Sequence, residues 1–63
     1  MIEVTRLNGS IYFLNPEMIL TIEKTPDTVI TLNSGEKLLA KESPEELRRR
    51  FIAYKKELFA GPF

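Results

Sequence analysis

The sequence predicts an α+β protein: a five-stranded antiparallel curled sheet, built as a meander, followed by one C-terminal helix. Two observations lead to this fold class. Short apolar or β-branched segments separated by turn residues continue to residue 41, and one amphipathic segment follows them. Because parallel strands need crossovers of roughly a dozen residues or more, strands joined by such tight turns must be antiparallel. The length of 63 residues leaves room for a single domain, residues 1–63.

The first two strands are expected to form a hairpin. Alternating apolar and polar residues predict a strand over residues 2–7, and the return strand over residues 10–14 is apolar on both faces. Asn8-Gly9 lies between them, and both residues accept the positive φ of a type I′ turn. Pro16 then ends the pairing, since proline has no amide proton to donate.

Three further strands are predicted, over residues 19–25, 28–32 and 36–41. In the first of these, Leu20 and Ile22 are expected to share one face. Pro26 fixes φ for a turn into the next strand, which is mostly β-branched and suits a half-buried sheet. Gly35 supplies the positive φ that closes the last hairpin.

The C-terminal helix is predicted over residues 44–59 from its start and stop signals. Ser43 can cap the helix, Pro44 suits the first helical position, and Glu46 completes an S-x-x-E capping box. Gly61-Pro62 ends the helix. One apolar stripe on this helix is expected to cover the sheet, and it consists of Leu47, Phe51, Tyr54 and Leu58.

A second, narrower apolar line on the helix has two interpretations. Ile52 and Phe59 lie seven residues apart and form this line. Basic residues flank it, namely Arg48 and Lys55 on one side and Arg49 and Lys56 on the other. The line is either a widened edge of the core with ordinary surface apolar residues, or a basic-rimmed contact patch for a partner protein. In the second interpretation these six residues are the partner-binding candidates.

The composition favours self-association. A chain this short buries only about 60% of the surface that its unfolded form exposes, so its own core gives marginal stability. It has no cysteine and no histidine, which excludes disulfides and the usual zinc ligands. With 43% hydrophobic residues, a homo-oligomer is the expected source of further stability.

The sequence lacks the residue patterns of an enzyme. Nucleophilic catalysis needs a serine or cysteine beside a base, and no histidine is present to activate a serine. The carboxylates around residues 42–46 fit helix capping, and the three glycines are too scattered for a phosphate-binding loop. We therefore expect no catalytic residue, no cofactor and no metal site.

Charge and hydropathy also limit the partners. Nine basic and nine acidic residues cancel, so no overall field attracts nucleic acid. Residues 44–63 carry five basic residues against three acidic ones, whereas residues 1–43 carry four against six. The start of the chain lacks the features of a signal peptide, and no stretch approaches the ~20 apolar residues of a membrane span. A cytoplasmic protein without membrane insertion is expected.

Several short motifs follow one another in a characteristic order. They are Val4-Thr5-Arg6-Leu7-Asn8-Gly9, Leu14-Asn15-Pro16, the run from Ile22-Glu23 through Thr25-Pro26-Asp27-Thr28 to Gly35-x-Lys37, and Lys41-Glu42-Ser43 before the helix. In this order and spacing the chain resembles the FlbD/SwrD family of small bacterial flagellar and swarming motility proteins. The resemblance implies a non-enzymatic cytoplasmic accessory factor whose partners are flagellar motor or stator-associated proteins. It implies no ligand and no catalytic residue.

A second resemblance gives an alternative function. Thr5-Arg6 in a first strand, five short strands and a C-terminal helix are also similar to the CsrA-type RNA-binding regulators. That resemblance would make Arg6 the RNA contact. No second basic cluster follows the fifth strand, and the net charge is zero where phosphate binding requires an excess of basic residues.

Overall fold

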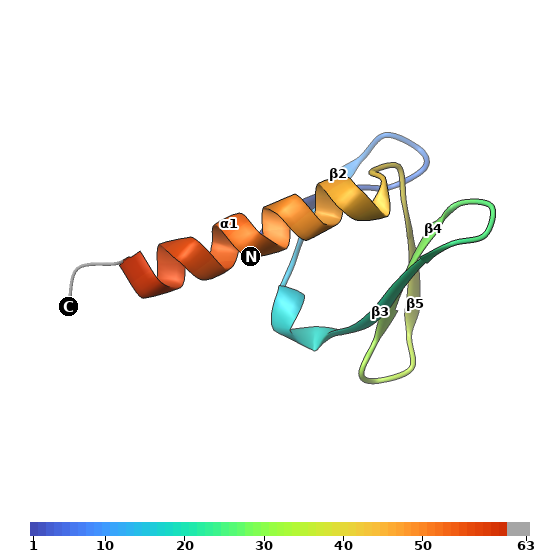
Figure 1. Ribbon diagram of the computed structural model, residues 1–63. Helices are drawn as coiled ribbons and strands as arrows, with labels where there is room; N and C mark the ends of the chain where they lie inside the picture. The colour runs from blue at the N-terminus through green and yellow to red at the C-terminus, as the bar shows by residue number, and fades with distance from the viewer. Residues whose placement is uncertain (61–63) are drawn as a thin grey trace.

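The computed structural model describes the backbone of residues 1–60 and the side chains of residues 1–58. It contains five antiparallel strands and one helix, which confirms the predicted fold class (Figure 1). The elements are β1 (Ile2–Thr5), β2 (Ile11–Leu14), a 3-10 turn η1 (Pro16–Met18), β3 (Ile19–Lys24), β4 (Thr28–Leu32), β5 (Lys37–Ala40) and α1 (Pro44–Ala60).

The strands pair in sequence order but form two sheets instead of one continuous sheet. β1 pairs with β2, and β3, β4 and β5 form the second sheet in that order. The break lies at η1, where the Asn15 side chain accepts a hydrogen bond of 3.1 Å from the Glu17 amide and Pro16 is buried. This turn redirects the chain, so β2 and β3 do not pair although they are consecutive.

The first hairpin closes through a different turn from the one predicted. In the turn, the Gly9 amide donates to the Arg6 carbonyl at 2.9 Å, and the Arg6 amide donates to the Ser10 carbonyl at 2.7 Å. Gly9 has φ +94°, whereas no residue other than glycine has a positive φ in the part of the chain that is described. The expected type I′ turn, which needs a positive φ at Asn8 also, is therefore wrong. A three-residue loop with glycine in the left-handed position forms instead.

A β-bulge interrupts the pairing of β3 with β4. Ile19 pairs with Leu32 and Thr21 pairs with Thr31, so Leu20 is an extra residue without a partner. The bulge interrupts the alternation from which Leu20 and Ile22 were expected to share one face. Ile22 is half-buried opposite Ile30, whereas Leu20 is 67% exposed.

The core lies between the two sheets and the first turns of the helix. Its buried apolar residues are Ile2, Val4, Leu14, Ile30, Leu32, Ala40 and Leu47. Of the predicted helix stripe, Leu47 is fully buried, Phe51 and Tyr54 are half-buried, and Leu58 is 47% exposed. The placement of Leu58 in the core is therefore wrong. The last turns of α1 extend past the strands, which leaves them nothing to cover (Figure 1).

The helix start agrees with half of the predicted capping box. The Ser43 hydroxyl accepts a hydrogen bond of 3.1 Å from the Glu46 amide, which confirms Ser43 as the cap. The Glu46 carboxylate does not reach back to Ser43. It instead accepts from Arg49 at 2.6 Å and from Arg50 at 3.0 Å. Charged donors on the next turn thus replace the backbone amide as its partners.

Candidate protein-binding groove

An apolar groove lies between β3 and the first turns of α1. Its volume is about 570 Å³. Residues 19–22 of β3 line one side, and Pro44, Arg48, Phe51 and Ile52 line the other. We call this hollow the β3–α1 groove.

The groove has exposed apolar walls and one charged residue. Leu20 is 67% exposed because of the bulge, and Ile52 on the facing helix is 40% exposed. Among the described residues, Arg48 is the single charged residue in the lining, and no carboxylate lines the groove there. Exposed apolar residues facing each other across a hollow are suited to burying an apolar side chain of another molecule.

The structure brings together two of the six predicted partner-binding residues. Arg48 and Ile52 both line the β3–α1 groove. Arg49 is held by Glu46 on the same helix at 2.6 Å. Lys56 is exposed outside the groove lining. The side chain of Phe59 lies outside the described residues, so the line that it was expected to form with Ile52 is described only at Ile52.

The remaining predicted residue, Lys55, connects the helix to η1. Its ammonium group lies 2.7 Å from the Glu17 carboxylate and 5.5 Å from the centre of the Phe51 ring. Lys55 therefore braces the helix next to the groove, and it is not among the groove-lining residues.

Sequence reasoning did not find the strand side of the groove. Leu20 and Thr21 line it because the bulge changes how β3 presents its side chains. Alternation of apolar and polar residues carries no sign of an extra residue, so the sequence offered no signal for this. Phe51, expected in the core stripe, is half-buried and lines the groove, and it is not among the residues that pack against the core.

A carboxylate clamp fixes the start of the helix against β1. The Glu42 side chain, only 8% exposed, accepts hydrogen bonds from the Thr5 amide at 2.9 Å and from the Thr5 hydroxyl at 2.6 Å. Arg50 donates to the same carboxylate at 3.0 Å and to the Glu3 carbonyl at 2.6 Å. Beside the clamp, the Lys41 amide donates to the Thr5 carbonyl at 2.9 Å and joins the ends of β1 and β5. We call Thr5, Glu42 and Arg50 the Glu42 clamp.

Electrostatics of the Glu42 clamp favour the ionised carboxylate. Burial raises the pKa of Glu42, but the hydrogen bonds from Thr5 and Arg50 outweigh it and leave the pKa below its ordinary value. Paired in this way, the carboxylate holds α1 in place. The clamp thereby ties α1 to β1.

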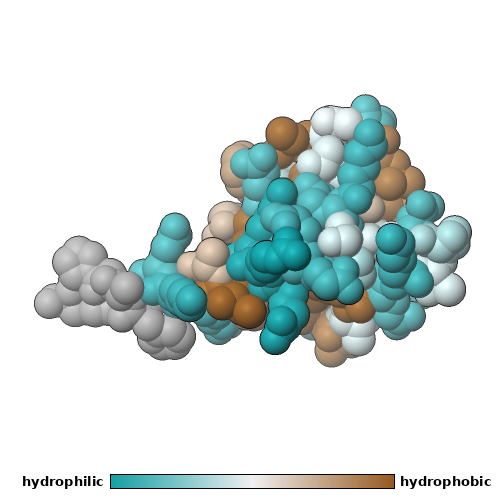
Figure 2. Space-filling model, turned by 45° about the horizontal axis from the view of Figure 1, so that its top comes forward, coloured by the Kyte–Doolittle hydropathy of each residue, from teal (hydrophilic) through white to brown (hydrophobic). Residues whose placement is uncertain are grey.

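Other apolar residues are exposed at scattered positions. On the face that Figure 2 shows, hydrophobic residues gather in several separate groups with hydrophilic residues between them. Phe13, which is 66% exposed, and Ile11 lie on the outer face of the first hairpin, opposite Glu3 and Thr5. The inner face of this hairpin carries the core residues instead.

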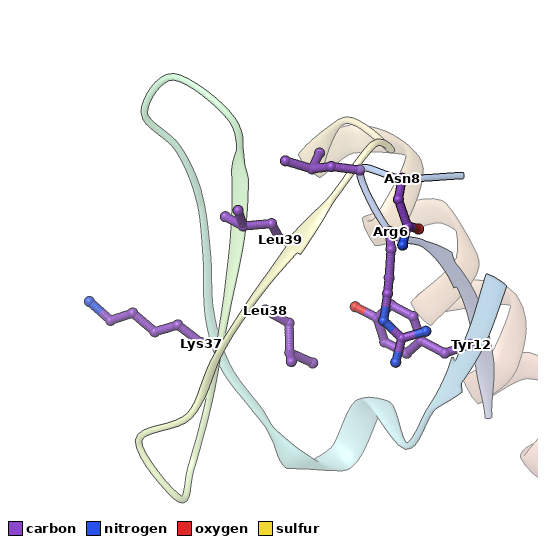
Figure 3. Close-up of a pocket in the computed structure, with 7 residues that line it drawn as sticks. Arg6, Asn8, Tyr12, Lys37, Leu38 and Leu39 are labelled. Atoms are coloured by element: carbon purple, nitrogen blue, oxygen red, sulfur yellow. The ribbon is translucent and has the colours of Figure 1, made fainter. Parts of the chain in front are cut away.

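The candidate RNA contact Arg6 lies at a second, smaller hollow of about 320 Å³. Its guanidinium stacks on Tyr12, 4.4 Å from the ring centre, while Leu38 points toward the pair from β5 (Figure 3). Lys37 points away from Arg6 in the same view. Burial raises the pKa of Tyr12 against the opposing effect of Arg6, and the Tyr12 hydroxyl has no hydrogen-bond partner among the described residues. The structure therefore does not place Lys37 beside Arg6 to form a basic cluster.

The described residues include neither a metal-binding cluster nor a membrane-spanning helix. No group of three or more histidine, cysteine, aspartate or glutamate side chains there could hold a metal ion. Within the same part of the chain, no helix combines the length and the apolar character that crossing a membrane requires.

These features define a small α+β protein with two antiparallel sheets, one helix and an apolar groove between strand and helix. A family model described as FlbD, flagellar and swarming motility proteins, matches residues 1–59. The chain therefore belongs to the FlbD family. No match was found among curated proteins or among solved structures.

Proposed function

We propose that the protein is a non-enzymatic, cytoplasmic accessory factor for flagellar and swarming motility, which binds a flagellar motor or stator-associated protein through the β3–α1 groove. Membership of the FlbD family indicates the biological process, which is flagellar and swarming motility. The observation that carries the proposal is the groove itself, in which exposed Leu20 and Ile52 face each other beside Arg48. Arginine is enriched among the residues that contribute most to protein interfaces, and exposed apolar patches beside polar residues mark interaction sites.

The rigidity of the groove supports the same function. Its helix side is fixed by the Glu42 clamp and by the ion pair between Lys55 and Glu17. Its strand side belongs to a three-stranded sheet. A binding surface that is held in shape before the partner arrives loses less conformational entropy on binding.

The test compares two helix variants in a motile host. Ile52→Ser changes the groove, whereas Leu58→Ser removes an exposed leucine from the same helix outside it. We expect both variants to keep nearly the melting temperature of the parent, since both side chains are substantially exposed. Swarming should fall with Ile52→Ser and persist with Leu58→Ser.

A charge variant keeps the test decisive if Ile52→Ser unfolds the protein. Arg48→Glu reverses the one charge of the groove at an exposed position, and Arg49→Glu is its control on the neighbouring residue. Normal swarming with folded Ile52→Ser and with folded Arg48→Glu would contradict the proposal.

We also propose that the protein self-associates through the outer face of the first hairpin. Phe13 and Ile11 are exposed there on a short two-stranded sheet. An exposed aromatic and aliphatic pair beside an unpaired strand edge favours contact with a second copy. This surface lies on β2, whereas the β3–α1 groove lies on the other sheet.

A further inference from the structure

We propose that the segment bound in the β3–α1 groove is an extended, acidic stretch of the partner protein that adds as a fourth strand to the free edge of β3. The inference rests on the proposed function and specifies the conformation and charge of the partner. Three observations carry it: an unpaired strand edge, a bulged leucine facing the helix, and an arginine without an acidic neighbour in the groove.

β3 borders the groove and has one edge without a neighbouring strand. β3 is the end strand of its sheet and pairs only with β4. Four consecutive residues, 19–22, line the groove. The bulge at Leu20 interrupts the regular alternation of side chains here, so all four of these consecutive residues of an end strand line the hollow.

Backbone groups along this edge are available for pairing. The Ile19 amide already donates a hydrogen bond to the Pro16 carbonyl in η1. Beyond it, in residues 20–24, the described hydrogen bonds join the backbone of β3 to β4 alone. Unpaired edge groups of this kind accept an added strand, whereas a bound helix satisfies its own backbone groups and leaves the edge unpaired.

Leu20 gives the added strand a side-chain site. The bulge leaves Leu20 exposed without a partner in β4, and Ile52 and Phe51 face it across the groove. One apolar side chain of the added strand can pack among these three residues. In strand addition the main chain supplies affinity and such pockets for alternate side chains supply specificity.

Arg48 sets the charge of the added strand. The ion pairs of the described helix residues engage Arg49, Arg50 and Lys55, and none engages Arg48. In the part of the chain whose side chains are described, no carboxylate lines the groove to compete for Arg48. An aspartate or glutamate in the bound segment would pair with Arg48, and a lysine at that place would be repelled.

Three labelled synthetic peptides test the proposal with the full-length protein. The first alternates valine with glutamate, the second alternates valine with lysine, and the third repeats the first with N-methyl groups along one edge of its backbone. Binding is measured by fluorescence anisotropy, and the site by amide chemical shifts and hydrogen exchange. We expect the acidic peptide alone to bind and to protect the amides of residues 20–24.

Protein variants assign the binding to the groove. Arg48→Ala should weaken the acidic peptide roughly tenfold, as expected for the loss of one charge-assisted contact. Arg49→Ala, on the neighbouring residue outside the groove, should leave its affinity unchanged. Arg48→Glu should reverse the preference toward the lysine peptide.

Each contrary result overturns the proposal. Equal binding of the N-methylated peptide would show that no strand is added. Absence of binding by the acidic peptide at millimolar concentration would exclude such a site. Protection of residues 20–24 that rises with protein concentration alone would make a second copy the occupant. Peptide binding without a swarming defect in Arg48→Ala would support this inference and contradict the proposed function, so the two can fail separately.

Discussion

Arg50 and Glu42 form an ion pair of 3.0 Å that ties the second turn of α1 to the segment just before the helix. Glu42 in turn accepts from both the amide and the hydroxyl of Thr5 on β1. One carboxylate therefore connects the first strand to the helix and, through Arg50, to the Glu3 carbonyl. In a 63-residue protein, a contribution of about 1–2 kcal/mol from such a connection would be a large share of the total stability.

We predict that Glu42→Gln destabilises the protein. The amide keeps the shape of the side chain but removes the charge that Arg50 and Thr5 contact. Loss of hydrogen bonds to a buried charged group costs about 1.5–3 kcal/mol. Urea denaturation measures the change. Glu45→Gln, an exposed residue on the first helical turn, is the control and should stay within about 0.5 kcal/mol of the parent.

Stability should also depend on pH through Glu42. Because its folded pKa lies below the ordinary value, the unfolded chain binds this proton more readily. The contribution of Glu42 is therefore fully present above its ordinary, unfolded pKa and is lost as the pH falls through the lower, folded pKa. Melting temperatures measured from neutral pH downward should fall less steeply in Glu42→Gln than in the parent. Parallel curves would show that Glu42 is not paired.

The parent protein should sediment as a dimer or larger species at micromolar concentration. Phe13→Ser should shift it toward the monomer mass of 7.3 kDa, because it removes the most exposed aromatic side chain of the first hairpin. Leu39→Ser, at an exposed position on the other sheet, is the matched control. A parent that stays monomeric across this range would exclude self-association.

Arg6→Ala separates motility from the RNA alternative. Under the proposed function we expect Arg6→Ala to swarm normally, since Arg6 lies at the smaller hollow and does not line the β3–α1 groove. RNA binding by the parent in a gel-shift assay, abolished by Arg6→Ala, would instead favour the RNA-binding function. The melting temperature of Arg6→Ala shows whether losing the Arg6–Tyr12 stacking destabilises the fold, and so separates that effect from a loss of RNA binding.

The strands and the helix could be predicted because their signals are local. Alternating apolar residues, Gly9, Gly35 and the Ser43 cap act within a few residues of the chain. The division into two sheets depends on how η1 redirects the chain, and adjacent strands give no sign of it. Leu58 has the periodicity of a core residue but extends beyond the strands, because the helix is longer than the surface it covers.

The candidate site was predictable only on its helix side. Arg48 and Ile52 follow from the helical period, which places basic residues beside an apolar one. The strand side depends on a bulge at Leu20, and the Glu42 clamp joins residues 37 positions apart in the chain. Contacts between residues so far apart in the sequence arise from tertiary packing. Local sequence patterns carry no information about them.

The bulge at Leu20 has a consequence for how this protein can diverge. Every other position of β3 from Ile19 to Lys24 pairs with a residue of β4, so its replacement also alters the sheet. Position 20 is exempt from that pairing and touches the groove directly. A mutation at position 20 can change the size or the polarity of the side chain with little effect on folding. Relatives could thus acquire different recognition preferences by drift at a single site while the scaffold stays constant.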